Sequence, residues 1–478
     1  SLEADASKLT MMTKANDPNL ENDTNISSNS NLSNKTNAPK IDVFLEKLST
    51  NTKLTVSQND KELNLLNPSS NVELLGLSGQ LDDIKITNEL SHLLLTDLAL
   101  KQDSNSNINV DGSLSFNSKQ LDLDSTLNSL NAHYQSIQFA SQVALNKTLE
   151  KLNVNTLNTS LVTNTLGFTQ GPMTLTNEAT DLSLPTLNLE VFLNETASLS
   201  VDLETQLSSQ NTYFKNADDF AQYKEVFFSG SLALAQKEQL ISVDGKALKF
   251  EAHDLAADQV GYKLDSKLIQ FSLPNILLQQ TSEQDIELTA DPKIDLEAIN
   301  VFDADNDQLL GLGSLSSSPV HIEKTPSSMT LKMDDITLAN AIISKPNPDH
   351  GETQHLAKFS KLHANALDIS DTKANIQSVI LTDLQSNLLF DEKRVLRNLV
   401  FAKADPELEE ISANTTNATS AKTATEANES HSAPQNTSAE EAIPAATYHV
   451  QLGEFKINGD SNIHINDKGI SPSLNQTI

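Results

Sequence analysis

The sequence predicts an all-β protein whose strands form a long, curved, mostly antiparallel sheet, an open β-groove of stacked repeats with one or two short helices. Three observations predict this fold. Apolar and polar residues alternate with a period of two, turn-forming pairs recur at intervals of about ten residues, and only 4% of residues are aromatic, with no Trp. Alternation is typical of strands with one buried and one solvated face, and few large aromatic side chains favour an extended sheet over several compact cores.

Residues 1–39 differ from the rest of the chain in composition. They are rich in Asn, Ser, Thr and Lys, and have too few apolar side chains to offset the entropy lost on ordering. We expect this segment to be irregular or disordered. The apolar residues that follow it, Phe44, Leu45 and Leu48, have helical spacing, which predicts a short helix over 40–49.

A repetitive β domain is predicted over 40–410. Turn signals such as Asn67-Pro68, Asn117-Ser118 and Asp244-Gly245 divide it into about two dozen strands of about ten residues each. The alternating apolar residues form one stripe, and its clearest members are Ile108, Val110, Leu114, Phe116, Val226, Phe228, Leu232, Leu234, Ile269, Phe271, Leu273, Leu331 and Met333. The opposite phase holds Asn, Asp, Ser, Thr, Lys or Gln, so one face of the sheet should be apolar and the other solvated.

Two local features add detail to this domain. Gly112-Ser113-Leu114 and Gly230-Ser231-Leu232 begin similar segments, which indicates growth of the sheet by similar hairpins. The segment 216–225 interrupts the alternation. Asn216 could cap a helix there, with two Asp residues in its first turn, so a second short helix is predicted.

The C-terminal part holds a low-complexity tract at 411–446, which we interpret as a linker. Residues 447–478 then return to strand-like alternation as the start of a further β unit. The chain opens on Ser1 with no basic or apolar leader, and it contains no run of about 18 apolar residues. We expect a fragment of a longer protein from which a membrane anchor is missing.

The formal net charge of −31 disfavours nucleic acid and anionic lipid headgroups as partners. The absence of Cys excludes a disulfide framework, a thiolate zinc site and a Cys nucleophile. No Gly-x-Ser-x-Gly elbow and no Gly-rich phosphate loop occurs, and sugar-stacking aromatics are scarce. We therefore predict a protein that is not an enzyme and uses no cofactor.

Two segments resemble metal sites. Asp303-Ala304-Asp305-Asn306-Asp307 has the alternating acids of a calcium loop, but Gln308 and Ser314 stand where an EF-hand needs Gly and an acid. A hairpin turn rich in Asp and Asn explains the segment better.

The second segment carries His350, His355 and His363. Pro and Gly mark the first part of it as a loop, and a spacing of five residues places two His side chains on no common helix or strand face. We predict no metal site.

The apolar stripe has two possible uses. It could line an open groove in which acyl chains lie, gaining roughly 0.8 kcal/mol per buried CH₂. Alternatively, the strands could close over a dry core, as in a structural or adhesive extracytoplasmic module. Alternation alone fits both.

A family resemblance favours the groove. The resemblance lies in residues 358–402 and 448–478. The second segment carries an apolar strand, a turn with Gly, a strand that ends in Asp, and a Pro: Val450-x-Leu452-Gly453-x-Phe455-x-Ile457, Gly459, Ile463-x-Ile465-x-Asp467 and Ile470-Ser471-Pro472. This unit resembles the AsmA-like superfamily of bacterial periplasmic envelope proteins, of the AsmA, TamB and YhdP type, in its uncharacterised branch. Ile465 stands where an aromatic residue is common in that family.

The resemblance implies a periplasmic protein that is anchored in the inner membrane through an N-terminal segment. It implies a hydrophobic groove for phospholipid transport between envelope membranes, or a role in outer-membrane assembly. The implied partners are phospholipid acyl chains, the inner membrane and outer-membrane proteins. No catalytic residue follows from it, and the thirteen residues of the stripe are interpreted as the lining of the groove.

Overall fold

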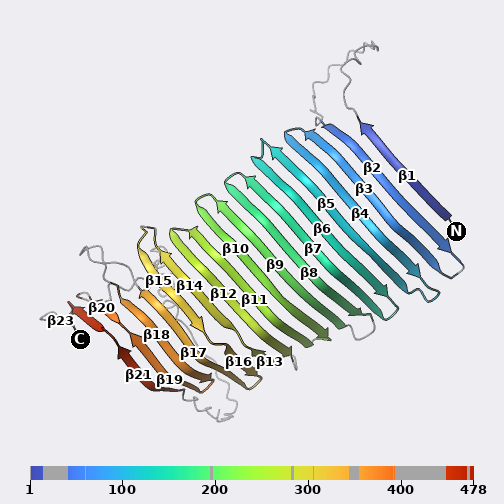
Figure 1. Cartoon of the computed structure of the whole chain (residues 1–478). Helices are drawn as coiled ribbons and strands as arrows, with labels where there is room; N and C mark the ends of the chain where they lie inside the picture. The colour runs from blue at the N-terminus through green and yellow to red at the C-terminus, as the bar shows by residue number, and fades with distance from the viewer. Residues whose placement is uncertain are drawn as a thin grey trace, which may run out of the picture.

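The computed structural model is a single sheet of 23 strands in which the strands lie side by side in a long row (Figure 1). The structure describes residues 2–13, 41–392 and 448–477, with gaps at 60, 194–197, 239, 281–284, 305, 344–354, 391 and 471–473. These residues contain no helix. The predicted all-β fold of a long, curved, mostly antiparallel sheet is confirmed.

The first twelve strands follow the chain from one end of the sheet. They are β1 (Leu2–Thr13), β2 (Ile41–Gln58), β3 (Leu63–Leu81), β4 (Ile84–Gln102), β5 (Ile108–Ser125), β6 (Leu130–Lys147), β7 (Lys151–Gln170), β8 (Met173–Phe192), β9 (Ser198–Asn216), β10 (Asp219–Lys237), β11 (Leu240–Gln259) and β12 (Tyr262–Gln280). Each pairs antiparallel with the next, so this part is an uninterrupted meander.

The remaining strands are shorter. They are β13 (Ile286–Ala290), β14 (Lys293–Phe302), β15 (Gln308–Ser317), β16 (Val320–Thr325), β17 (Ser328–Ile343), β18 (Ala357–Ser370), β19 (Lys373–Thr382), β20 (Gln385–Phe390), β21 (His449–Asn458), β22 (Asn462–Asp467) and β23 (Leu474–Thr477). Here one position in the sheet is often filled by two strands in succession: β13 with β14, β15 with β16, and β19 with β20. β21 and β22 continue the sheet in parallel pairing with β19 and β20.

Two lines of skipped positions cross the sheet and bend every long strand twice. The first line, which we call the first crease, comprises Leu54, Pro68, Asp97, Gly112, Ser141, Asn158, Pro185, Thr205, Gly230, Ala247, Pro274, Asp291–Pro292, Ser318–Pro319, Asp334, Ala366, Gln377 and Gly453. A residue that is inserted into one strand bends that strand and increases its twist.

The second crease comprises Glu46, Gly76, Glu89, Gln120, Gln135, Thr165, Glu178, Asn211, Lys224, Asp254, Lys267, Ala298, Gly313, Asn340, Ser360, Asp383 and Gly459. Many residues of both creases have positive φ, among them Asp97, Asn158, Asn211 and Asp254. Asn and Asp tolerate this region better than other residues with a side chain, which explains why the creases are rich in them.

The creases divide each long strand into three panels: a middle panel between them, a first side panel beyond the first crease, and a second side panel beyond the second. The inserted residues of the second crease, such as Gln120 and Glu178, are exposed, whereas their neighbours Ser118 and Asn177 on the apolar side are buried. Residues inside a bend are covered by the adjoining panels, and residues outside it are not. The apolar face is therefore the concave side of the sheet.

Both predicted helices are wrong, and the second crease explains why. Residues 41–49 lie in β2 and residues 219–225 in β10. Glu46 and Lys224 are inserted residues, and an insertion moves the apolar residues that follow into the opposite phase. The resulting intervals of three and four residues imitate a helix. Ala217, with φ of 53°, lies in the tight turn that joins β9 to β10.

Several predicted turns also lie inside strands. Pro68 is in β3, Ser118 in β5 and Gly245 in β11, so most strands of the meander are 18–20 residues long rather than about ten. Pro68, Gly112 and Gly230 belong to the first crease. The turn-forming residues thus mark bends within strands.

The predicted segments map onto the sheet as follows. β1 lies within 1–39, and the rest of that segment and the tract 411–446 lie outside the described residues. The strands at 449–477 are not a separate unit, because β21 and β22 pair with β19 and β20 of the same sheet. The two parts of the sequence that carry the family resemblance are therefore neighbours.

Candidate functional site

The concave face carries an unbroken row of large apolar side chains along the middle panel. Each member is the register partner of the next, from β3 to β14. We call it the central row: Val72, Leu93, Phe116, Phe139, Leu161, Leu182, Leu207, Phe228, Phe250, Phe271 and Ile294. Ten strand spacings of about 4.8 Å give this row a length of about 48 Å.

The structure brings all thirteen predicted lining residues onto this face. Those of the middle panel are Leu114, Phe116, Val226, Phe228, Ile269, Phe271 and Leu273. Those of the first side panel are Ile108, Val110, Leu232, Leu234, Leu331 and Met333.

The sequence prediction missed the second side panel. Its apolar-face residues include Phe168, Leu175, Phe214, Leu264 and Val301. Leu175 is the register partner of both Phe168 and Phe214, and Leu264 is the register partner of Val301. The inserted residue of the second crease changes the phase ahead of this panel, so period-two alternation does not connect it to the middle panel. The second side panel could have been found by testing for alternation separately on each side of an Asn, Asp or Gly.

Large parts of the concave face remain accessible to solvent. Phe250, Phe271 and Ile294 of the central row are 36%, 37% and 40% exposed. Only five apolar side chains in the described part of the chain are buried, and four of them are Ala. Because a closed core would bury many large aliphatic residues, this sheet has an open apolar surface instead.

Polar side chains occur on the concave face chiefly at the creases, where they satisfy interrupted backbone groups. Asn88 Nδ2 donates to the carbonyl of Lys119 at 3.0 Å, and Ser266 Oγ donates to that of Glu297 at 3.3 Å. Unpaired backbone carbonyls are costly when buried, so these contacts stabilise the bends. They are uncharged, and they leave the central row apolar.

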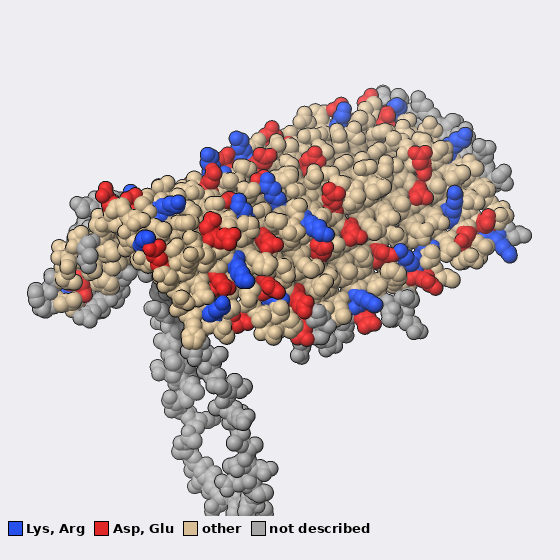
Figure 2. All heavy atoms as spheres, turned by 60° about the horizontal axis from the view of Figure 1, so that its bottom comes forward, with Lys and Arg blue, Asp and Glu red and all other residues tan. Residues whose placement is uncertain are grey.

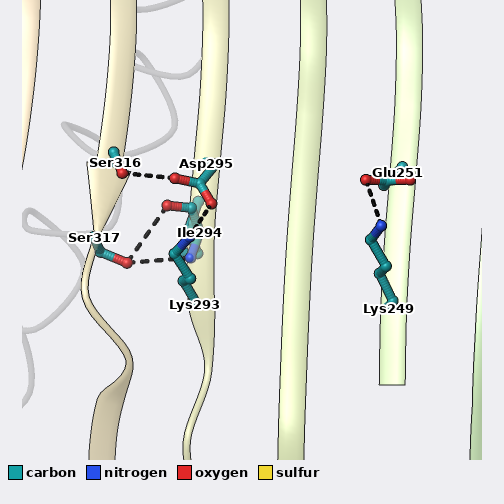
Figure 3. Close-up of polar contacts among 7 residues, drawn as sticks. All are labelled: Lys249, Glu251, Lys293, Ile294, Asp295, Ser316 and Ser317. Carbon is teal, nitrogen blue, oxygen red and sulfur yellow. Dashed lines mark hydrogen bonds and ion pairs between the residues drawn. The ribbon is translucent and has the colours of Figure 1, made fainter. Parts of the chain in front are cut away.

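The opposite, convex face carries the charges. Figure 2 shows basic and acidic side chains spread over one face of the sheet. Lys249 Nζ lies 2.8 Å from Glu251 Oε1, and Lys293 Nζ lies 2.7 Å from Asp295 Oδ2, each two residues along one strand (Figure 3). The pKa of Asp295 is lowered although partial burial opposes this, because Lys293 and the Ser316 hydroxyl, 2.6 Å away, stabilise its carboxylate. The two faces therefore differ sharply in polarity.

The other candidate sites have structural explanations. Asp303 Oδ1 accepts the Asp307 N–H at 2.9 Å, and the segment is the turn between β14 and β15, as predicted. His363 lies in β18 and His355 precedes it, whereas His350 lies outside the described residues. No group of three or more His, Asp or Glu side chains that could hold a metal ion occurs among the residues the structure describes.

Among the residues that the structure describes, there is no helix long and apolar enough to cross a bilayer. Comparisons with family models, with curated proteins and with solved structures found no match to this chain. The candidate site is therefore defined by its geometry alone: a concave, uncharged apolar groove on an acidic sheet.

Proposed function

We propose that the concave face binds phospholipid acyl chains, and that the protein is a conduit segment for phospholipid transport between bacterial envelope membranes. The observation that carries the proposal is the central row, an apolar and partly exposed surface that runs through eleven consecutive positions of the sheet without a charge. An acyl chain that lies along it gains roughly 0.8 kcal/mol for each CH₂ removed from water.

The polarity of the two faces supports this use. The convex face provides solubility through its ion pairs and its excess of carboxylates, while the concave face offers only weak polar contacts. Headgroups would remain in solvent at the groove mouth, since burying an ionised group without a partner is costly. Transport would be passive, by movement of acyl chains along a uniform surface.

The alternative function, a structural or adhesive module, requires a closed dry core. The five buried apolar side chains are too few to form one within the described sheet, and β1 and β21 each pair with one neighbour only. The groove is therefore the better account of the apolar face.

The periplasmic location, inner-membrane anchoring and role in outer-membrane assembly rest on the AsmA-like resemblance of 358–402 and 448–478. The described parts of these segments form β18–β20 and β21–β23, which lie together at one end of the sheet. An end position is where a conduit would meet a partner or a membrane.

Lipid extraction from the purified chain, followed by mass spectrometry, tests the proposal. Phe271→Glu places a charge in the central row and should lower the amount of bound phospholipid by about tenfold or more. The control is Ser272→Glu, on the convex face, where the new carboxylate lies between the register partners Lys249 and Lys293. It should bind lipid like the parent chain. A parent chain without lipid, or equal lipid in both variants, would contradict the proposal.

A further inference from the structure

The groove is not equally wide along its length. Between the two creases, β3 and β4 share seven paired positions, from Ser69–Thr96 to Leu75–Leu90. β14 and β15 share only three, from Asp295–Ser316 to Glu297–Ser314, and β15 and β17 share four. The strand pairs from β6 to β12 share five or six such positions, and β17 and β18 share five again. At about 3.3 Å per residue, the middle panel narrows by roughly 10 Å from β3–β4 to β14, β15 and β17, and by less from the strands between them.

Burial changes at the same place. Of the five buried apolar side chains, Ala290, Ala341, Phe359 and Ala364 lie in β13, β17 and β18. Ala290 lies beyond the first crease, and Ala341 and Phe359 lie beyond the second crease. Ala364 lies between the creases, in the middle panel. The fifth, Ala252, lies in β11, and Ile294 at the edge of the narrow stretch is 40% exposed. Four of the five buried apolar side chains therefore gather in β13, β17 and β18.

The central row also changes its character at this point. After Ile294, the next position is Ser317, which is 5% exposed. The Ile294 N–H donates to Ser317 Oγ at 3.1 Å, and Ser317 Oγ also lies 3.4 Å from the Ile294 carbonyl (Figure 3). Pro292 and Pro319 interrupt the strands here, and the Ser317 hydroxyl takes the place of the backbone hydrogen bonds that would continue the ladder. The narrow stretch is thus held by specific contacts.

We propose that β14, β15 and β17 form a constriction that admits one acyl chain where the wider groove of β3–β12 admits the two chains of a diacyl lipid side by side. The inference rests on the proposed lipid-binding function and adds a substrate preference to it. The floor of the constriction is the register row Leu296, Leu315 and Leu338. Single-chain amphiphiles should occupy both regions, and diacyl lipids should favour the wide one.

The absence of Cys makes a direct test possible, because one substitution introduces one labelling site. A polarity-sensitive fluorophore is attached to Phe139→Cys in the wide groove and, in a second protein, to Leu338→Cys in the constriction. Each is titrated with palmitate and with micelle-solubilised diacyl phosphatidylethanolamine. Palmitate should shift both fluorophores at similar concentrations. The diacyl lipid should shift the Phe139→Cys label at a concentration about tenfold lower.

The outcomes separate the two proposals. If neither ligand shifts the Phe139→Cys label, the lipid-binding function fails. If the diacyl lipid shifts both labels at the same concentration, lipid binding stands and the constriction is wrong. Adding Leu315→Ala to the Leu338→Cys protein shortens the register partner of the labelled residue and should bring the two diacyl midpoints closer together, with circular dichroism confirming that the sheet is intact. An unchanged difference would also overturn the constriction.

Discussion

Strands β2–β12 and strands β13–β22 cross the same two creases in different ways. In the first region each strand of 18–20 residues passes both creases without ending. In the second, β13 and β15 end at the first crease, beside Pro292 and Pro319, and β19 and β21 end at the second. The creases are therefore a property of the whole sheet, and strand continuity across them is optional.

The difference shows that the two regions produce the bend by different means. In β2–β12 an inserted residue with positive φ, such as Asp97 or Asn158, bends the strand while the ladder continues on both sides. In β13–β16 proline removes a backbone donor, and Ser317 and Ser318 supply replacement hydrogen bonds. The first solution depends on backbone conformation and the second on side chains, so each should fail under a different substitution.

The largest effect should come from Gly230 in the continuous region. Its φ of 152° is rarely adopted by residues with a side chain, and a Cβ there would lie 2.9 Å from Leu248 Cα. Gly230→Ala should destabilise the sheet by about 2–3 kcal/mol. Hydrogen exchange of β10 and β11 measures this.

Gly112→Ala is the matched control, because Gly112 also lies on the first crease but has no positive φ. Equal losses of protection in the two variants would show that backbone conformation does not hold the bend.

The next effect should come from Ser317 in the interrupted region. Ser317→Ala leaves the Ile294 N–H without its partner in a buried place and should cost about 1–2 kcal/mol. Ser316→Ala, which removes only an exposed bond to Asp295, should cost less than about 0.5 kcal/mol. Urea unfolding of the two variants distinguishes them, and a reversed order would refute the role of Ser317.

A smaller effect is expected from pH at the end of the sheet. The hydroxyl of Ser360 and the N–H of Asp460 donate to Asp383 at 2.7 and 3.0 Å, which lowers the pKa of that carboxyl. A depressed pKa stabilises the folded state above the ordinary Asp value, and this stability is lost as the pH falls through the folded-state pKa.

A fluorophore on Val450→Cys in β21 should therefore report a urea midpoint that falls between pH 6 and pH 3. Asp383→Asn should reduce this pH dependence. A midpoint that falls equally in both proteins would assign the effect to other carboxylates.

The smallest effect should come from the convex ion pairs. Lys249→Gln removes a partly exposed contact to Glu251 and should change stability by no more than about 0.5 kcal/mol. Thermal unfolding at low and at high salt measures it. A larger loss that disappears at high salt would show that the charge rows on this face act together.

Sequence pattern predicted the sheet and the apolar face because period two is a local property of each strand segment. It did not predict the creases, since a single inserted residue such as Glu46 or Lys224 changes the phase and imitates a helix. It placed Phe271 and Leu114 on one apolar face, and both lie on the concave face of the sheet. It missed Phe214 and Leu264 because they lie beyond the phase change.

The width of the groove could not be predicted at all. It depends on how far apart the two insertions fall in each strand and on how they align between strands. Pro292 and Pro319 are visible in the sequence as breaks, but only their register shows that they border the same narrow panel.

The pairing of each strand with its immediate neighbours has a thermodynamic consequence. Stability in such an array is close to a sum of nearest-neighbour terms, so opening should begin at the ends and move inward strand by strand. A hairpin such as β6–β7 could then be deleted or duplicated with little effect on distant strands. Each such change would alter the length of the sheet, measured across its strands, by about 10 Å and leave the cross-section of the groove unchanged.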